Sequence, residues 1–185
     1  EIIDQTRLPF RFEIVRLESA AAAMDAIRRM LVRGAPLIGA TAAYGLCLGL
    51  REDVRDAHLE RLATELIDCR PTAVNLRWAV ARMLARLRPL PAGERLRAAY
   101  GEAALICDED VAVNEAIGTH GLGLIEAVWR QKGGRGPVRI LTHCNAGWLA
   151  TVDWGTALAP VYKAAAAGIA VHVLVDETRP RNQGA

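Results

Sequence analysis

The sequence is poor in aromatic residues, which make up 5% of its 185 positions, and its formal net charge is only +2. A charge balance so close to zero gives no support for a nucleic acid partner or for binding to an anionic membrane surface. The four cysteines lie far apart and form no C-x-x-C pair, which argues against a zinc site and against a disulfide framework. Free cysteines in a chain that shows no signal peptide indicate a reducing, cytoplasmic location.

Long hydrophobic runs are also scarce. The one long uncharged run covers residues 34–50, and it is interrupted by glycines, a proline and polar residues. A membrane-spanning helix needs about 20 consecutive apolar residues, so a buried helix explains this run better. What the sequence does contain is 52% hydrophobic residues, many of them alanine, and 24% charged residues. This composition is typical of a soluble globular protein built from closely packed helices.

Apolar periodicity predicts that the first part of the chain is mainly helical. Residues 1–17 have the pattern of a small β-ribbon, and Ser19 is a suitable N-cap for the helix that follows. Helical spacing of apolar residues then predicts helices over residues 20–31, 36–50, 57–68, 71–87 and 94–132. The helix over 36–50 is almost uncharged on all sides, which indicates a central position. Pro71 is expected in the first turn of its helix, and the glycines at 118, 121 and 123 mark a place where the last helix could bend.

From Gly133 onward the pattern changes to strands. Residues 138–142 and 171–175 are predicted strands, with a helix over 156–167 between them. A strand, a helix and a strand at this spacing form a right-handed βαβ unit, which is the start of a parallel sheet. We therefore expect an α/β fold with a mainly helical N-terminal domain over residues 1–132 and the first part of a Rossmann-like domain over residues 133–185. A sheet that stops after two strands leaves edges and apolar faces uncovered, so we expect a piece of a longer protein.

Two arginines of the helical domain precede predicted helix starts. In the loop Arg33-Gly34-Ala35-Pro36, the glycine lets the backbone approach a ligand. The amides of a helix N-terminus together with the Arg33 guanidinium suit a phosphate group. The alternative is an ordinary corner between two helices with Arg33 in solvent. Arg70 could reach the same anion, or it is an ordinary surface arginine.

The loop Thr142-His143-Cys144-Asn145-Ala146-Gly147 directly follows the first predicted strand. Loops at the carboxyl ends of parallel strands carry the chemistry of α/β folds, and a thiol there can act as a nucleophile or a base. A buried structural cysteine is the alternative. The side chains of His143 and Cys144 point to opposite faces of an extended segment, so we do not expect them to pair. The loop over residues 176–185 follows the second strand, and its polar composition suits a binding loop at least as well as a solvated one.

Two further features have simpler explanations. The small residues over 114–121 permit close packing of a helix backbone, and the acidic run over 108–110 is typical of a solvated face. The sequence has no glycine-rich nucleotide-binding motif, and no pair of histidines has the spacing of metal ligands.

Taken in order, these motifs resemble the methylthioribose-1-phosphate isomerase family. The matching stretches cover almost the whole chain: DQTRLP (4–9), RGAPLIGATAAYGL (33–46), RPTAVNLRWAVARM (70–83), NEAIGTHG (114–121), THCNAGWLATVDWGTAL (142–158) and VDETRPRNQGA (175–185). The resemblance implies a helical N-terminal domain followed by a Rossmann-like domain, a homodimer, and an enzyme that needs no metal or organic cofactor.

By this resemblance, Cys144 matches the catalytic cysteine, and the substrate-binding positions are Arg33, Gly34, Ala35, Arg70 and Gln183. The implied reaction converts 5-methylthioribose 1-phosphate to 5-methylthioribulose 1-phosphate, a step in methionine salvage. The enzyme opens the sugar ring and moves hydrogen from the second carbon to the first, and a cysteine at a strand end suits proton movement. The family aspartate that assists ring opening has no counterpart here, so we expect the 185-residue chain alone to be inactive.

Related families leave alternatives open. Isomerases of 5-deoxyribose 1-phosphate and of ribose 1,5-bisphosphate share the fold, and regulatory subunits of the eukaryotic initiation exchange factor share it without turnover. The intact loops around Arg33 and Cys144 favour an enzyme, because a scaffold has no need of the thiol. Trp148 and Trp154 beside the cysteine favour an apolar pocket for a methylthio or methyl group, unless both belong to the core.

Overall fold

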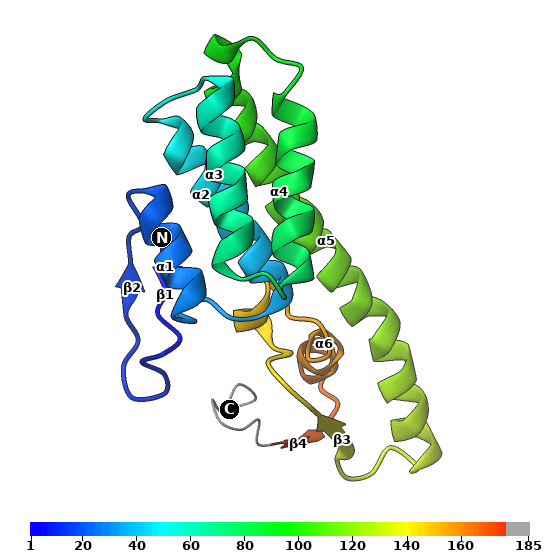
Figure 1. The fold of residues 1–185 in the computed structure, drawn as a ribbon. Coiled ribbons are helices and arrows are strands. Elements are labelled where there is room, and N and C mark those ends of the chain that lie inside the picture. Colours follow the sequence, from blue (N-terminus) through cyan, green and yellow to red (C-terminus); the bar gives the residue numbers. More distant parts are fainter. Residues whose placement is uncertain (177–185) are drawn as a thin grey trace. The chain divides into compact units, whose positions relative to one another are not determined.

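A computed structural model of the chain describes residues 1–176 and is mainly helical, with a small antiparallel ribbon and a short parallel sheet (Figure 1). The chain forms two compact units, one over Glu1–Asp108 and one that begins at Glu109. The long helix α5 (Ala92–Gln131) contributes residues to both units. It continues without a break through the three glycines where a bend was expected. The division into domains after residue 132 stays a prediction.

The first unit opens with the predicted β-ribbon. β1 (Ile2–Ile3) pairs with β2 (Ile14–Val15) in antiparallel orientation. Helix α1 (Ala20–Arg28) follows, and its N-cap is Ser19 as predicted. The serine hydroxyl accepts a hydrogen bond from the Ala22 amide at 3.1 Å, which satisfies a donor that the first helical turn leaves unpaired.

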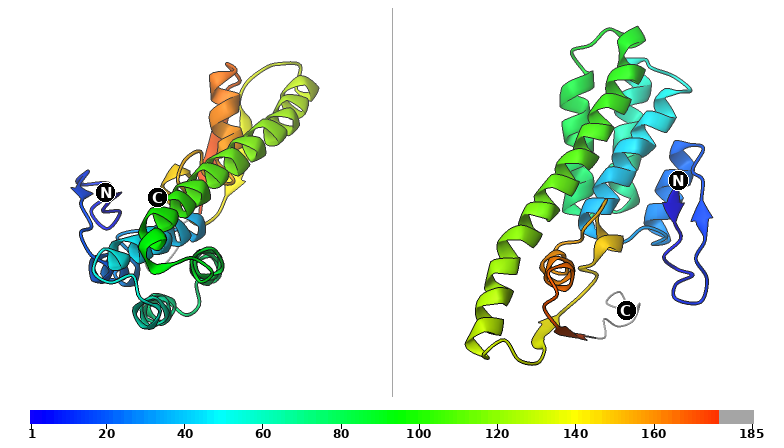
Figure 2. Two further views of the ribbon diagram at one scale, coloured as in Figure 1. Left: turned by 90° about the horizontal axis from the view of Figure 1, so that it is seen from above. Right: turned by 180° about the vertical axis from the view of Figure 1, so that it is seen from behind.

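Helices α2 (Ala35–Leu50), α3 (Asp56–Cys69) and α4 (Val74–Leu87) pack side by side, and the view from above in Figure 2 looks along α3 and α4. Helix α2 is central, as its apolar composition predicts, and most of its residues are buried. Its three glycines, Gly39, Gly45 and Gly49, allow the neighbours to come close. A Cβ atom at Gly49, for example, would lie 2.3 Å from Cδ2 of Leu62, so a larger residue there would force the Leu62 side chain to move.

Two predicted helix starts are wrong. Pro71 lies outside the first turn of α4, which begins at Val74, because the Ala73 amide bonds to the Arg70 carbonyl at 3.0 Å and closes a turn around the proline. Helix α6 (Ala159–Ala166) begins three residues later than predicted. The amides of Thr156 and Leu158 both bond to the Ala146 carbonyl, at 3.1 and 3.2 Å, and therefore belong to the preceding loop.

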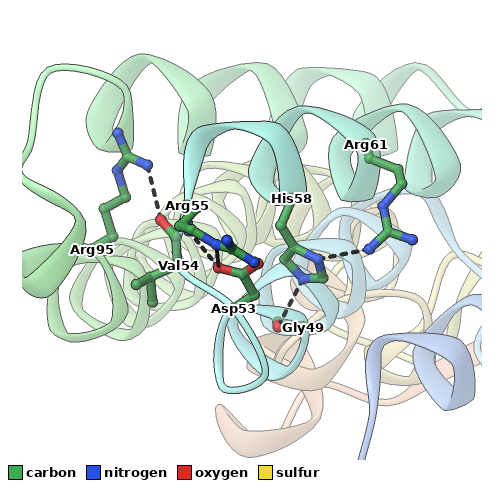
Figure 3. A network of polar contacts seen from close by, with 7 residues as sticks. All are labelled: Gly49, Asp53, Val54, Arg55, His58, Arg61 and Arg95. Carbon is green, nitrogen blue, oxygen red and sulfur yellow. Dashed lines mark hydrogen bonds and ion pairs between the residues drawn. The ribbon is translucent and has the colours of Figure 1, made fainter.

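Polar contacts hold the connection between α2 and α3, as Figure 3 shows. The Asp53 carboxylate accepts hydrogen bonds from Nε and Nη2 of Arg55 at 3.0 and 2.8 Å, and these bonds lower the pKa of Asp53 to about 2. His58 Nε2 lies 3.1 Å from the Gly49 carbonyl, and its Nδ1 lies 2.8 Å from Arg61 Nη2. The start of α3 is thus bonded to the end of α2.

A buried arginine fastens three helices of the same unit together. Arg95, in the first part of α5, is only 5% exposed. Its guanidinium donates to the carbonyls of Val54 at 2.9 Å, Leu90 at 3.1 Å and Leu87 at 3.3 Å, and it forms an ion pair with Asp56 (Figure 3 shows the bond to Val54). The start of α3 and the end of α4 are therefore both held by one side chain from α5.

The second unit contains the parallel strand pair. β3 (Val138–Thr142) lies beside β4 (Val171–Val175) in parallel register, with Thr142 opposite Val175, and α6 lies between them in the chain. The predicted strand, helix and strand are thus confirmed. A small apolar core joins α5, α6 and the strands through Ile125, Val138, Ala164 and Ile169. Within residues 1–176, none of the helices combines the length and the apolar character that crossing a membrane requires.

Candidate functional site

The Arg33 loop forms the start of α2. Gly34 is the N-cap of this helix and has a φ of +113°, a backbone conformation that glycine adopts far more readily than other residues. Ala35 and Pro36 begin the helix, and no side chain caps it. The first-turn amides of α2 are therefore left to another acceptor, as the predicted phosphate site requires.

The first turns of α2 and α4 lie close together in the first unit. A Cβ atom at Gly39 would lie 3.0 Å from the Asn75 carbonyl oxygen, and Figure 1 shows both helices starting at the same end of the bundle. Helix α4 also lacks a side-chain cap. Two helices that begin side by side place the positive ends of both dipoles at one location, which favours an anion there.

Arg33 and Arg70 both enter this end of the bundle, one from the loop before α2 and the other from the turn before α4. Both side chains are partly buried, and Nη1 of Arg70 is a buried donor with no hydrogen-bond partner among the described residues. A buried donor left without an acceptor costs about 1–3 kcal/mol, which an anion would offset. The structure thus brings Arg33, Gly34, Ala35 and Arg70 to one end of the α2–α4 pair, and their role in binding a substrate stays a prediction.

Cys144 lies in the second unit, two residues after the end of β3. It is exposed, so the alternative of a buried structural cysteine is wrong. Its φ is +66°, a left-handed conformation that costs a non-glycine residue about 1–2 kcal/mol. Strain of this kind occurs preferentially at functional sites, where the surrounding structure holds it in place.

The loop around Cys144 folds back on itself. The Ala146 carbonyl accepts the amide of Thr156 at 3.1 Å, and Thr151 Oγ1 accepts the amide of Gly155 at 3.0 Å. A Cβ atom at Gly155 would lie 2.4 Å from the carbonyl carbon of Gly147, so the two glycine backbones are in direct contact. These contacts close the segment that follows Cys144 into a compact loop.

His143 pairs with Asp176 rather than with Cys144. The two residues follow the neighbouring strand ends, and His143 Nδ1 lies 3.3 Å from Asp176 Oδ2. The Asp176 amide also donates to the Thr142 carbonyl at 3.1 Å. Sequence reasoning missed this pair, although the equal positions of both residues after adjacent parallel strands were a signal for it. The rest of the second polar loop, with the predicted binding residue Gln183, lies outside the described residues.

The acidic run on α5 is more than the solvated face that its composition indicates. Asp110 is half-buried, and its Oδ2 accepts the Val152 amide of the cysteine loop at 2.8 Å. Burial raises the pKa of this carboxyl, although the bond from Val152 opposes the shift. Sequence reasoning missed Asp110, because a helical pattern does not show which distant segment packs on an acidic residue.

The small residues of α5 do serve packing, as predicted. A Cβ atom at Gly121 would lie 2.3 Å from Cγ of Pro160, so the backbones of α5 and α6 approach closely at this point. Further along, Lys163 of α6 forms an ion pair with Glu115 at 3.3 Å, and its Nζ lies 4.4 Å from the ring centroid of Trp154. Trp154 thus forms a cation–π contact with Lys163.

Trp148, in a short 3₁₀ turn over Trp148–Ala150, is 45% exposed. The residue is therefore not part of the core, and it lies four positions after Cys144 in the chain. In the part of the chain that the structure describes, no cluster of three or more His, Cys, Asp or Glu side chains could hold a metal ion.

The fold and the site define an α/β protein in which two uncapped helices begin side by side in one unit and a strained, exposed thiol follows a strand end in the other. The sequence model of the initiation factor 2 subunit family matches residues 31–185. The chain therefore belongs to the initiation factor 2 subunit family.

Curated proteins with similar sequences are named methylthioribose-1-phosphate isomerase. The protein from Rhodospirillum rubrum is 63% identical over 188 residues, which cover 100% of this chain and 48% of the relative. The protein from Methylobacterium nodulans is 65% identical over 184 residues, covering 100% of this chain and 50% of the relative. The chain thus spans about half the length of the curated relatives it matches.

Two solved structures share the fold. The 5-methylthioribose 1-phosphate isomerase from Pyrococcus horikoshii OT3 superposes with a TM-score of 0.83 at 36% identity, covering 98% of this chain and 51% of that one. The translation initiation factor eIF-2B, subunit delta, from A. fulgidus superposes with a TM-score of 0.81 at 39% identity, covering 99% of this chain and 53% of that one.

Proposed function

We propose that the protein to which this chain belongs is an aldose–ketose isomerase that converts 5-methylthioribose 1-phosphate to 5-methylthioribulose 1-phosphate. The observation that carries the proposal is the 63% identity to the Rhodospirillum rubrum isomerase along the whole chain. Two structural features support it. A sugar-phosphate isomerase needs a place to bind the phosphate, which the uncapped starts of α2 and α4 beside Arg70 suit, and a group that moves a proton, which the exposed thiol suits.

In this proposal the substrate phosphate binds where α2 and α4 begin. Arg33 and Arg70 supply charge, and Gly34 and Ala35 supply backbone amides beside it. Gln183 completes the binding set. The reaction breaks the ring C–O bond at the first sugar carbon and the C–H bond at the second, and it forms a new C–H bond at the first. The hydroxyl on the second carbon becomes the ketone, and its proton balances the one that the released ring oxygen takes up. Cys144 is the group that moves the proton between the two carbons.

The remaining features of the proposal follow from the family resemblance. The whole protein completes a Rossmann-like domain, acts as a cytoplasmic homodimer in methionine salvage, and uses no metal or organic cofactor. The 185-residue chain by itself does not turn over substrate, because the aspartate that assists ring opening is not part of it.

The first test is an isomerase assay on the full-length protein, in which NMR follows the conversion of 5-methylthioribose 1-phosphate to its ketose. We expect turnover that Cys144→Ser abolishes and that Cys107→Ser, a change at a half-buried cysteine on α5, leaves intact. Turnover by Cys144→Ser equal to that of Cys107→Ser and of the unsubstituted protein would remove Cys144 from the mechanism. A folded full-length protein without turnover would contradict the methylthioribose proposal.

Rival substrates are separated in the same assay. The exposed Trp148, close to the cysteine in the chain, favours a methylthio or methyl group at the fifth sugar carbon over a second phosphate. We therefore expect faster conversion of 5-methylthioribose 1-phosphate, or of its 5-deoxy analogue, than of ribose 1,5-bisphosphate.

A non-catalytic regulatory subunit is the second candidate. The structural match to the A. fulgidus protein, named as a subunit of a translation initiation factor, favours it. A full-length protein that binds a nucleotide and isomerises none of the three sugar phosphates would support this candidate.

Arg70→Ala tests the anion site. Removal of a charged hydrogen-bond donor costs about 1.5–3 kcal/mol, which corresponds to a rise in KM for the sugar phosphate of about 10-fold or more. Arg86→Ala is the matched control, because Arg86 is exposed in the last turn of the same helix, at its opposite end. Equal KM values for the two variants would place the phosphate elsewhere.

A further inference from the structure

The segment that carries Cys144 is fastened to α5 by one carboxylate. Asp110 is half-buried on α5, and its Oδ2 accepts the Val152 amide at 2.8 Å. We propose that Asp110 is a positioning residue for Cys144, which acts by holding the loop after β3 in its folded-back conformation. The catalytic meaning of this proposal rests on the proposed isomerase function.

Asp110 is itself held in place from within α5. Asn114, one turn further along the helix, is 2% exposed and donates from Nδ2 to the Asp110 carbonyl at 2.9 Å. Burial removes part of the hydration of the carboxylate, and hydrogen bonds from the Val152 amide and the Asn114 side chain partly compensate this loss. An apolar residue at this position would leave the amide without the acceptor that it has in the structure.

The contact with Val152 reaches Cys144 through the closed loop. Thr151, next to Val152, holds the Gly155 amide through its hydroxyl at 3.0 Å. The backbone of Gly155 in turn contacts the backbone of Gly147, which lies three residues after the cysteine. Movement of Val152 away from α5 would therefore release the backbone that keeps Cys144 at a φ of +66°.

A second fastening between the same elements supports this arrangement. Glu115 on α5 pairs with Lys163 on α6 at 3.3 Å, and Lys163 lies over the ring of Trp154. The first contact joins α5 directly to the segment between β3 and α6, and the second reaches Trp154 of that segment through Lys163 of α6. Since the hydrogen bond from this segment to Asp110 comes from a backbone amide, we assign Asp110 the role of positioning the thiol and not of reacting.

The test compares three single variants of the full-length protein. Asp110→Ala removes the acceptor, and Asp110→Asn keeps an acceptor oxygen in the same place. Asp108→Ala is the control, at an exposed acidic neighbour. We expect Asp110→Ala to lower kcat about 10-fold, as loss of one buried hydrogen bond does, with KM within about 2-fold. Asp110→Asn should restore kcat to within about 3-fold of the unsubstituted protein, and Asp108→Ala should match that protein.

Hydrogen exchange of peptides that cover residues 143–156 supplies a readout that needs no turnover. Asp110→Ala should speed exchange in this segment about 10-fold, whereas Asp110→Asn should not. If the unsubstituted protein isomerises nothing, the proposed function fails and the exchange rates alone decide the positioning role. Where Asp110→Ala does not fold, Asp110→Glu, which displaces the carboxylate by one methylene, decides the same question.

Unchanged kcat and unchanged exchange in Asp110→Ala would overturn the proposal. Faster exchange with unchanged kcat, in a protein that turns over substrate, would also overturn it, because Asp110 would then support the fold without positioning the thiol. A kcat that Asp110→Asn fails to restore would indicate that the charge, and not the hydrogen bond, matters.

Discussion

At the scale of single residues, the cysteines show how strongly the surroundings decide chemistry. Cys47 is buried in the first unit, and desolvation raises its pKa to about 12. Burial raises the pKa of Cys69 as well. A thiol that stays protonated at neutral pH is a poor nucleophile, so these two residues serve packing. Cys144 is exposed and has a strained backbone, which separates it from the other cysteines in a way that composition cannot.

The strain at Cys144 predicts an unusual order of stabilities. Because its φ of +66° suits glycine, Cys144→Gly should be more stable than Cys144→Ala by about 1 kcal/mol in urea unfolding of the 185-residue chain. The same pair of substitutions at Cys107, within the helix α5, should give the opposite order by about 1 kcal/mol. Alanine as the more stable residue at both positions would show that the backbone at 144 is relaxed in solution.

At the scale of elements, α5 contains glycines that look alike in the sequence and differ in space. A Cβ atom at Gly121 would meet Pro160 of α6 at 2.3 Å, whereas one at Gly123 would meet nothing within 4 Å. The first glycine permits helix packing, and the second only weakens the helix.

This difference predicts opposite effects of the same substitution. Gly121→Ala should destabilise the chain by about 1–3 kcal/mol, because α6 must move. Gly123→Ala should stabilise it by about 0.5–1 kcal/mol through helix propensity. Thermal unfolding followed by circular dichroism measures both. Stabilisation by both substitutions would mean that α6 does not pack on α5 at this point.

The buried guanidinium of Arg95 gives a second prediction for elements. Arg95→Met keeps most of the apolar volume and removes the guanidinium donor from the carbonyls of Val54, Leu87 and Leu90, of which Leu87 keeps the bond from the Leu90 amide. We expect a loss of about 2–4 kcal/mol in the free energy of unfolding. Arg97→Met, at an exposed position of the same helix, is the control and should change it by less than about 0.5 kcal/mol. Equal values for the two variants would refute this role of Arg95.

At the scale of the whole molecule, the two units differ in the size of their cores. The first unit buries large side chains from five helices, among them Leu46, Leu66 and Met83, all fully buried. The described core of the second unit consists of Ile125, Val138, Ala164 and Ile169, and two of its strand partners, Leu141 and Leu174, are exposed by 68% and 49%. Burial of apolar area is the main source of stability, so the second unit should be the less stable one.

We therefore expect the 185-residue chain to unfold in two steps. Amide hydrogens of α2 and α4 should exchange at least about 10-fold more slowly than those of β3 and β4 under native conditions, because local opening of the second unit exposes less apolar surface. Exchange measured by mass spectrometry on peptides from each unit tests this. Equal protection of both units would show that they unfold together.

The sequence by itself determined the elements of this protein. Apolar residues at helical spacing, Ser19 as a cap and the two apolar strands predicted the ribbon, the six α-helices and the parallel strand pair, because these features depend on neighbours in the chain. The order of the motifs also pointed to the loops of Arg33, Arg70 and Cys144 as the candidate site.

Only the tertiary structure decided which of these residues meet. The start of α6, the turn at Pro71, the pair of His143 with Asp176 and the bond from Val152 to Asp110 all depend on partners that are distant in the chain or on competing local bonds. A one-dimensional pattern records whether a residue is polar, but the hydrogen bond that it makes is decided by the surface that folding brings against it. For that reason the acidic run on α5 has the pattern of a solvated face, while in the structure one of its carboxylates holds the cysteine loop.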